Sequence, residues 1–164
     1  MPEIRQVYDH LNELKGLLEQ FKCLVFQERS DITNLDITGL AAHRSMIEDL
    51  FPRVKKLSQQ TGTEIKTACD LSGISGEEGL TPLIALVPKP DRELFVNLQL
   101  SIQTVAAEIE NALSVNRALL EDSLAFTNQS LFMFTSMLKN SNTYGHGGRY
   151  LESVDRSMLI NREI

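Results

Sequence analysis

The pattern of apolar and polar positions predicts a chain built from long amphipathic helices. Between Asp91 and Lys139 the sequence contains no Pro and no Gly, and apolar residues recur at alternating steps of three and four. Such spacing is typical of a helix with a coiled-coil seam. The seam positions are Phe95, Leu98, Ile102, Val105, Ile109, Ala112, Asn116 and Leu119. At about 1.5 Å per residue this helix is roughly 70 Å long, so we expect the rest of the chain to lie along it.

Two further long helices precede this one. The first begins at Pro2, a favoured first-turn residue, and its pattern stops near Gln27 to Arg29. Its seam consists of Ile4, Val7, Leu11, Leu14, Leu18, Phe21 and Val25. Residues 30–38 are rich in Asp, Asn and Thr, which compete with helix for backbone hydrogen bonds, and we predict a connection there with Asp36 or Thr38 as the next helix cap.

The second helix is predicted from Thr38 to Leu71. Pro52 lies inside it and lacks a backbone donor, and Gly62 lowers helix stability by about 1 kcal/mol relative to Ala. We expect one bent helix, with two shorter helices as the alternative. The region that follows, Gly73 to Pro90, contains three Gly and three Pro. Within it, Thr81 and Pro82 form a cap and first-turn signal. This favours a short helix that plugs the end of a bundle, while a strand from Leu83 to Val87 is the alternative.

The C-terminal part differs from the helices before it. The long helix ends in a polar stretch that leads into Gly145-His146-Gly147-Gly148, which predicts a flexible hinge. Beyond it, Arg149 to Ile164 carries apolar residues at helical spacing but is too short to hold helix alone in water. The sequence therefore predicts an all-α fold. Residues 1–140 form an elongated antiparallel bundle of three long helices and a short one, and residues 141–164 form a flexible tail with a short partner-binding segment.

Composition narrows the functional classes. The 164 residues suit one domain, and the net charge of −6 argues against a nucleic-acid surface. No run of about twenty apolar residues could span a membrane, and the N-terminus does not resemble a secretory signal, so we expect a cytoplasmic protein. Cys23 and Cys69 are interpreted as two buried small hydrophobic residues, with a disulfide between the first two helices as the alternative.

The sequence shows no arrangement suited to catalysis. His10, His43 and His146 are isolated, no Glu-x-x-His motif is present, and no pair of His residues has zinc-ligand spacing. We expect His10 and His43 to be solvated, and we predict no enzyme activity, no cofactor and no metal. Asn116 is more informative, because a polar residue in an apolar seam tends to fix register or oligomeric state. A homodimer is therefore one possible outcome.

The second half of the long helix resembles a known family. The residues are Asn116-x-x-Leu119-Leu120-x-x-Ser123-Leu124-x-Phe126-x-Asn128, followed by Thr143-Tyr144-Gly145. This motif and the layout of the upstream helices are similar to the FlgN family of bacterial flagellar type III export chaperones. The resemblance implies that the chain binds hook–filament junction proteins at their helical C-terminal ends, prevents premature assembly and delivers them to the export gate.

The resemblance also suggests where a partner would bind. In the family the binding region lies toward the C-terminus, and in this chain the apolar stripe drifts after Leu119 to Leu120, Leu124 and beyond. The residues predicted to bind partners are Leu131, Phe134, Leu138, Tyr144, Leu151, Val154, Met158 and Leu159. An amphipathic tail of this kind can order on a partner's groove or helix. The alternative function is a non-enzymatic coiled-coil adapter or dimerisation module that uses the seam from Phe95 to Leu119.

Overall fold

Helices account for all the regular structure in the described part of the chain. The computed structural model describes residues 2–74 and 80–140, which form α1 (Pro2–Asn34), α2 (Ile37–Leu71), α3 (Leu80–Leu86) and α4 (Lys89–Asn140). Helices α1, α2 and α4 have 33, 35 and 52 residues, and α3 has 7. The prediction of an all-α fold with three long helices and a short one is confirmed. The chain divides into two compact units, Met1–Leu120 and Glu121–Ile164, which we call the N-terminal and C-terminal units.

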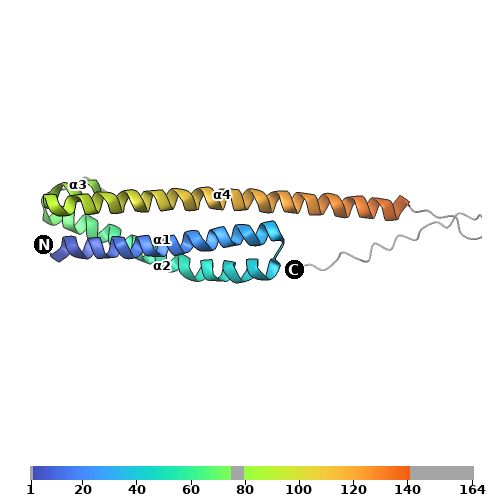
Figure 1. Ribbon diagram of the computed structural model, residues 1–164, viewed down its shortest axis with the longest axis horizontal. Coiled ribbons are helices and arrows are strands. Elements are labelled where there is room, and N and C mark those ends of the chain that lie inside the picture. Colours follow the sequence, from blue (N-terminus) through green and yellow to red (C-terminus); the bar gives the residue numbers. More distant parts are fainter. Residues whose placement is uncertain (1, 75–79, 141–164) are drawn as a thin grey trace, which may run out of the picture. The chain divides into compact units, whose positions relative to one another are not determined.

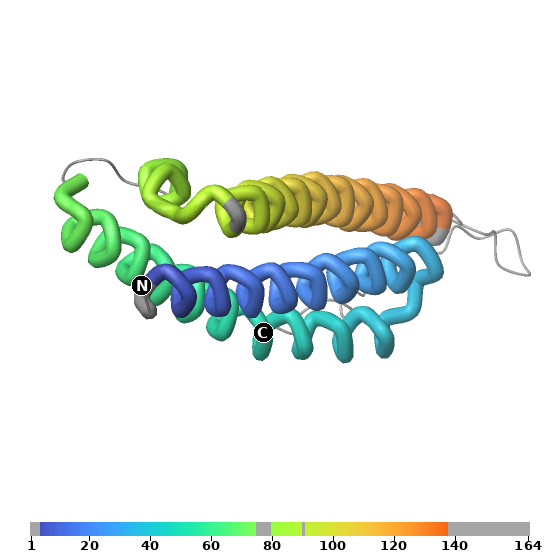
Figure 2. The backbone as a smooth tube through the Cα atoms, turned by 60° about the vertical axis from the view of Figure 1, so that its left-hand side comes forward, coloured from blue at the N-terminus to red at the C-terminus, as the bar shows by residue number. Residues whose placement is uncertain are grey.

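In the N-terminal unit, α1 and α2 form an antiparallel hairpin and the first part of α4 runs along it (Figure 1). The direction of α4 follows from its contacts with α1. The ring centroids of Tyr8 and Phe95 lie 5.2 Å apart, and Lys22 Nζ lies 2.9 Å from Glu108 Oε2. Since residue numbers rise together in both helices, α1 and α4 are parallel, and α2 runs against them, as the backbone trace shows (Figure 2).

Two clusters of buried side chains hold this unit together. The first joins all four helices near α3 and contains Val7, Leu11, Ala68, Cys69, Leu83, Ile84, Val87, Phe95 and Leu98. The second joins α1, α2 and α4 and contains Leu14, Leu17, Phe21, Val25, Leu50, Leu57, Val105, Ile109 and Ala112. The predicted seam of the long helix is therefore buried against the chain's own helices, with Ile102 and Leu119 only partly buried.

The connection after α1 is shorter than predicted. The prediction of a loop over residues 30–38 is wrong, because α1 continues to Asn34 and only two residues separate it from α2. Ile32 is buried and fixes this last turn to the core, and the Thr33 hydroxyl donates to the carbonyl of Arg29 within the helix (2.9 Å). Asp36 caps α2 as predicted, since its Oδ1 accepts from the backbone N–H of Gly39 at 3.0 Å.

Leu35 ends α1 in an unusual conformation. Its φ is 56°, in the left-handed region that glycine normally occupies at this position. The N–H of Asp36 donates to the carbonyl of Asp31 (2.9 Å), which closes a Schellman motif. The end of α2 uses the same motif with the expected residue, because Gly73 has a φ of 77° and the N–H of Ile74 donates to the carbonyl of Cys69.

Helices α2 and α3 settle two alternatives. Helix α2 contains Pro52 yet runs unbroken from Ile37 to Leu71, so the single helix is confirmed over two shorter ones. The predicted short helix is confirmed as α3, and the alternative of a strand at Leu83 to Val87 is wrong. Leu83 is fully buried in the first cluster, and α3 covers one end of the unit (Figure 2).

The cysteines are both free. Cys69 is buried in the first cluster, as predicted, whereas Cys23 is exposed, which corrects the expectation that both are buried. The alternative of a disulfide between α1 and α2 is wrong for the same reason.

Candidate functional site

Helix α4 carries a group of exposed apolar side chains in the C-terminal unit. From Glu121 to Met137 none of the described residues is buried. The large apolar side chains there are 51–74% exposed. We call them the α4 apolar surface, and its members are Leu124, Phe126, Leu131, Phe132, Met133, Phe134 and Met137. Exposed apolar residues at this density are typical of an interaction site.

The polar residues between them carry no charge. Residues 123–137 contain no Asp, Glu, Lys, Arg or His, and their polar members are Ser, Thr, Asn and Gln. Two of the hydroxyls are already bonded within the helix, because Thr127 donates to the carbonyl of Ser123 and Thr135 to that of Phe132, both at 2.9 Å. This segment therefore offers a partner apolar packing rather than ion pairs.

The α4 apolar surface covers more than one side of the helix. Successive residues turn by about 100°, so Leu124, Leu131 and Phe134 form one stripe. By the same geometry Phe126, Met133 and Met137 form a second stripe on nearly the opposite side. A helix that is apolar on opposite sides is normally enclosed by its neighbours. A partner that satisfies this surface must therefore contact both stripes.

The predicted partner-binding residues fall into three groups. Leu131 and Phe134 lie on the α4 apolar surface, 51% and 57% exposed. Leu138 belongs to α4, but its side chain is outside the described part of the structure. The others, Tyr144, Leu151, Val154, Met158 and Leu159, lie outside the described residues altogether. Their role remains a prediction.

The second stripe and Phe132 were not predicted from the sequence. Phe126, Phe132, Met133 and Met137 are as exposed as the predicted residues, but they do not fit a single seam with steps of three and four. The signal that would have found them is the absence of charge over residues 123–137 combined with their apolar content. A search for one amphipathic face discards such residues as irregular.

A buried polar cluster lies on the N-terminal side of this surface, at Asn116. Its Nδ2 donates to the carbonyl of Val25 (2.9 Å) and to Glu28 Oε2 (3.0 Å), and its Oδ1 accepts from Arg29 Nε (3.1 Å). Arg29 also donates to the carbonyl of Ala112 at 3.2 Å. These bonds fix the register of α4 against α1 within one chain, which confirms the register role predicted for Asn116.

The two helical histidines are not solvated as predicted. His10 Nδ1 lies 2.6 Å from Glu64 Oε2 of α2, and His43 Nδ1 lies 2.6 Å from Asp31 Oδ2 of α1. Each pair therefore bridges the α1–α2 hairpin. Burial alone would raise the pKa of Glu64, but hydrogen bonds from His10, Gln60 and Gln6 outweigh it and hold this pKa below its ordinary value.

Neither metal binding nor membrane insertion finds support in the described ranges. Over residues 2–74 and 80–140, no three His, Cys, Asp or Glu side chains come together as metal ligands. Within the same ranges, no helix combines the length and the apolar character needed to cross a bilayer.

Comparison with known proteins bears on the family. The family model described as FlgN protein matches residues 1–152 of this chain. Searches among curated proteins and among solved structures returned no match. The family match spans α1 to α4, including the α4 apolar surface and the Asn116 cluster. The chain therefore belongs to the FlgN family of flagellar export chaperones.

Proposed function

We propose that this chain is a cytosolic chaperone for flagellar hook–filament junction proteins. It binds their helical C-terminal regions, prevents premature assembly and delivers them to the flagellar type III export apparatus. Family membership supports the general role of an export chaperone that binds flagellar clients. The observation that carries the specific proposal is the α4 apolar surface, seven large side chains on one uncharged helical segment.

The size of this surface sets a requirement on the client. Fully burying one large apolar side chain contributes about 1.5–3 kcal/mol, so one stripe of three residues contributes at most about 9 kcal/mol. Association costs an estimated 4–15 kcal/mol, which leaves little net affinity for a partner that covers one stripe. Covering both stripes roughly doubles the gain. A client with two helical segments, or one helix together with the chain's own C-terminal segment, meets that requirement.

The C-terminal segment has a defined place in this proposal. Leu151, Val154, Met158 and Leu159 form an amphipathic pattern and lie outside the described residues. We propose that this segment folds on the client together with α4, with part of the binding energy spent on ordering it. Tyr144 is proposed as a contact to the client or to the export gate. No charged or catalytic group is needed, because the chaperone only covers an aggregation-prone surface reversibly.

The test is binding of a purified junction protein by single-residue variants. Leu131→Asp and Phe134→Asp each place a charge on the α4 apolar surface, and both are expected to weaken binding at least tenfold in isothermal titration calorimetry. Leu100→Asp is the matched control, because Leu100 is 56% exposed on the same helix but belongs to the N-terminal unit. Native affinity in both surface variants, with the control also native, would refute the proposal. Met158→Asp tests the C-terminal segment in the same way.

The alternative is a coiled-coil adapter that dimerises. The seam proposed for this, Phe95 to Leu119, is mostly buried by the chain's own helices, so a dimer would have to use the α4 apolar surface instead. Light scattering of the native chain and of Phe134→Asp separates the two functions. A stable native dimer that the variant converts to a monomer, without any binding of a junction protein, supports the adapter.

A further inference from the structure

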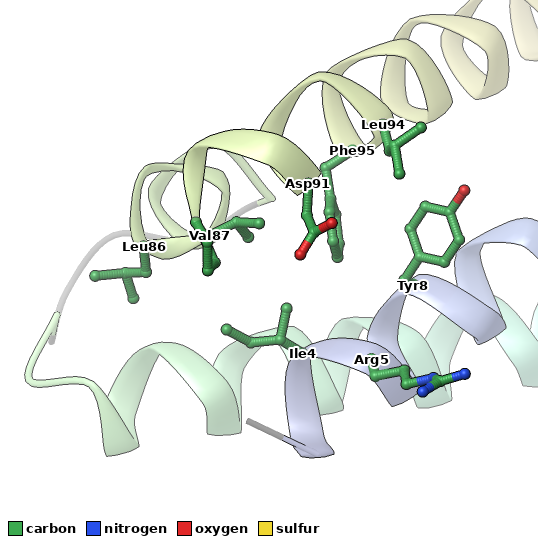
Figure 3. A pocket seen from close by; sticks show the side chains of 9 residues that line it. Ile4, Arg5, Tyr8, Leu86, Val87, Asp91, Leu94 and Phe95 are labelled. Carbon is green, nitrogen blue, oxygen red and sulfur yellow. The ribbon is translucent and has the colours of Figure 1, made fainter.

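A hollow lies at the end of the N-terminal unit where α1, α3 and α4 meet (Figure 3). Its volume is about 450 Å³, within the roughly 300–1,000 Å³ of pockets that hold ligands. The apolar lining consists of Ile4, Tyr8, Leu86, Val87, Pro88, Leu94 and Phe95. Val87 and Phe95 are buried, while Leu86 and Leu94 are 37% and 51% exposed at the rim. The hollow is therefore an apolar depression that is open to solvent.

Its walls are fixed without a ligand. The guanidinium of Arg92 donates from Nη2 to the carbonyl of Ala85 (2.8 Å) and to that of Val87 (3.4 Å), which ties the end of α3 to the first turns of α4. On the opposite side the rings of Tyr8 and Phe95 meet edge to face at 5.2 Å. Because these contacts hold α3, α4 and α1 in place, an occupant would not have to order the pocket on binding.

Water finds few polar partners on the walls of this hollow. An ordered water needs two to four polar partners, and this lining is mostly apolar. Displacing such water by an apolar group is favourable.

The charged groups at the rim indicate which apolar group fits. The carboxylate of Asp91 points into the hollow, whereas the guanidinium of Arg5 points away from it (Figure 3). Asp91 forms no ion pair with any residue in the described ranges. The lining therefore contains one anion and one cation, of which the Asp91 carboxylate faces the apolar floor, and the net charge of −6 adds to the attraction for cations.

We propose that this hollow binds a peptide segment of a partner protein in which a large apolar side chain is flanked by Lys or Arg. The apolar side chain enters between Ile4, Val87 and Phe95, and the neighbouring cation pairs with Asp91. A peptide rather than a small molecule is assigned because the family acts on polypeptides. This contact lies in the N-terminal unit and does not depend on the α4 apolar surface, so either site can fail experimentally without the other.

Blocked dipeptides test the chemistry directly on the full chain. Acetylated phenylalanyl-lysine amide, and its analogues with glutamine and glutamate in place of lysine, are titrated at millimolar concentration against ¹⁵N-labelled protein. The expected result is a set of amide shifts confined to the lining residues, with affinity falling from lysine to glutamine to glutamate. Asp91→Asn should weaken binding of the lysine peptide about two- to fivefold, the range of an exposed ion pair, and leave the glutamine peptide unchanged.

A matched pair of variants tests the location. Leu94→Lys places an ammonium at the mouth of the hollow and should abolish binding, whereas Leu100→Lys, at a similarly exposed position of α4 outside the lining, should not. Equal affinity for the lysine and glutamate peptides, scattered shifts, or native binding by Leu94→Lys would each overturn the proposal. The proposal would also be overturned if Met158→Asp shifted the amide signals of the lining residues without any added peptide. That result would assign the hollow to the chain's own C-terminal segment. If the amide signals of the lining residues shifted when the protein alone was diluted, the hollow would be assigned to a second copy of the chain, and this too would overturn the proposal.

Discussion

Replacing Asn116 by Leu should destabilise the chain although it makes the seam of α4 fully apolar. Asn116 is 2% exposed and makes three hydrogen bonds to α1 through its side-chain amide. The substitution leaves the carbonyl of Val25 without this donor. Among the described residues it leaves Glu28, whose side chain is 5% exposed, with Arg44 at 3.5 Å as its remaining partner, and the Arg44 side chain is 62% exposed.

The magnitude follows from two opposing terms. A hydrogen bond to a charged group contributes about 1.5–3 kcal/mol, so losing the bonds of Asn116 to Glu28 and to Arg29 costs about 4 kcal/mol. Burying the new Leu side chain returns about 2 kcal/mol. The expected net loss in the free energy of unfolding is about 2 kcal/mol. For a chain of this size that corresponds to a melting temperature lower by about 4–8 °C.

Urea denaturation followed by circular dichroism measures this loss. Asn111→Leu is the matched control, because Asn111 is exposed on the same helix and its substitution should change stability by no more than about 0.5 kcal/mol. The double variant Glu28→Leu with Asn116→Leu removes both partners and should recover part of the loss, with a coupling energy of about 0.5–3 kcal/mol. An Asn116→Leu chain as stable as the native one, or a coupling energy of zero, would refute the assignment of a stabilising register contact.

Three further substitutions test local features of the helices. Gly62→Ala should raise the free energy of unfolding by about 0.5–1 kcal/mol, because no atom lies within 4 Å of a Cβ built at Gly62; a less stable variant in urea denaturation would contradict this. Leu35→Gly should also stabilise by about 0.5–1 kcal/mol, because Leu35 has a φ of 56° and is 77% exposed; an unchanged denaturation midpoint would show that this conformation is not strained. Glu64→Gln should make the free energy of unfolding depend less on pH in the acidic range. Because the folded pKa of Glu64 is lowered below 4.5, its contribution is present above that pH and is lost as the pH falls through the lowered value. The difference in stability between native and variant chains should therefore shrink below about pH 4.5, and a difference that does not change with pH would contradict the ion pair with His10.

The bundle was predictable because its helices pack along one another. A seam with steps of three and four keeps the same side facing a neighbouring helix over many turns, and the seam positions from Phe95 to Asn116 are buried as that pattern requires, except for the partly buried Ile102. The short helix α3 was predictable from Thr81 and Pro82, although α3 begins at Leu80 and Thr81 therefore lies inside the helix and does not cap it. In both places the information lies within a few residues of the element itself.

The features that the sequence did not reveal depend on contacts between distant residues. Residues 30–34 stay helical because Ile32 is buried and Asp31 pairs with His43 of α2, although local propensity favours a loop. The partner of His10, Glu64, is 54 residues away and becomes adjacent only once the hairpin register is set. The N-cap was predictable from local chemistry, whereas a Leu at the left-handed position that ends α1 was not.

The candidate site was predicted only in part, and the reason also explains how it can be tested. Leu131 and Phe134 fit a seam, but Phe126 and Met133 lie on another side of the helix and fit none. In the described part of the chain, the α4 apolar surface is not covered by other residues, so it adds little burial energy to the fold. Substitutions there should change stability by about 0.5 kcal/mol or less. Loss of client binding in Phe134→Asp would therefore report on recognition, whereas the same loss after a core substitution such as Phe95→Asp would also report unfolding.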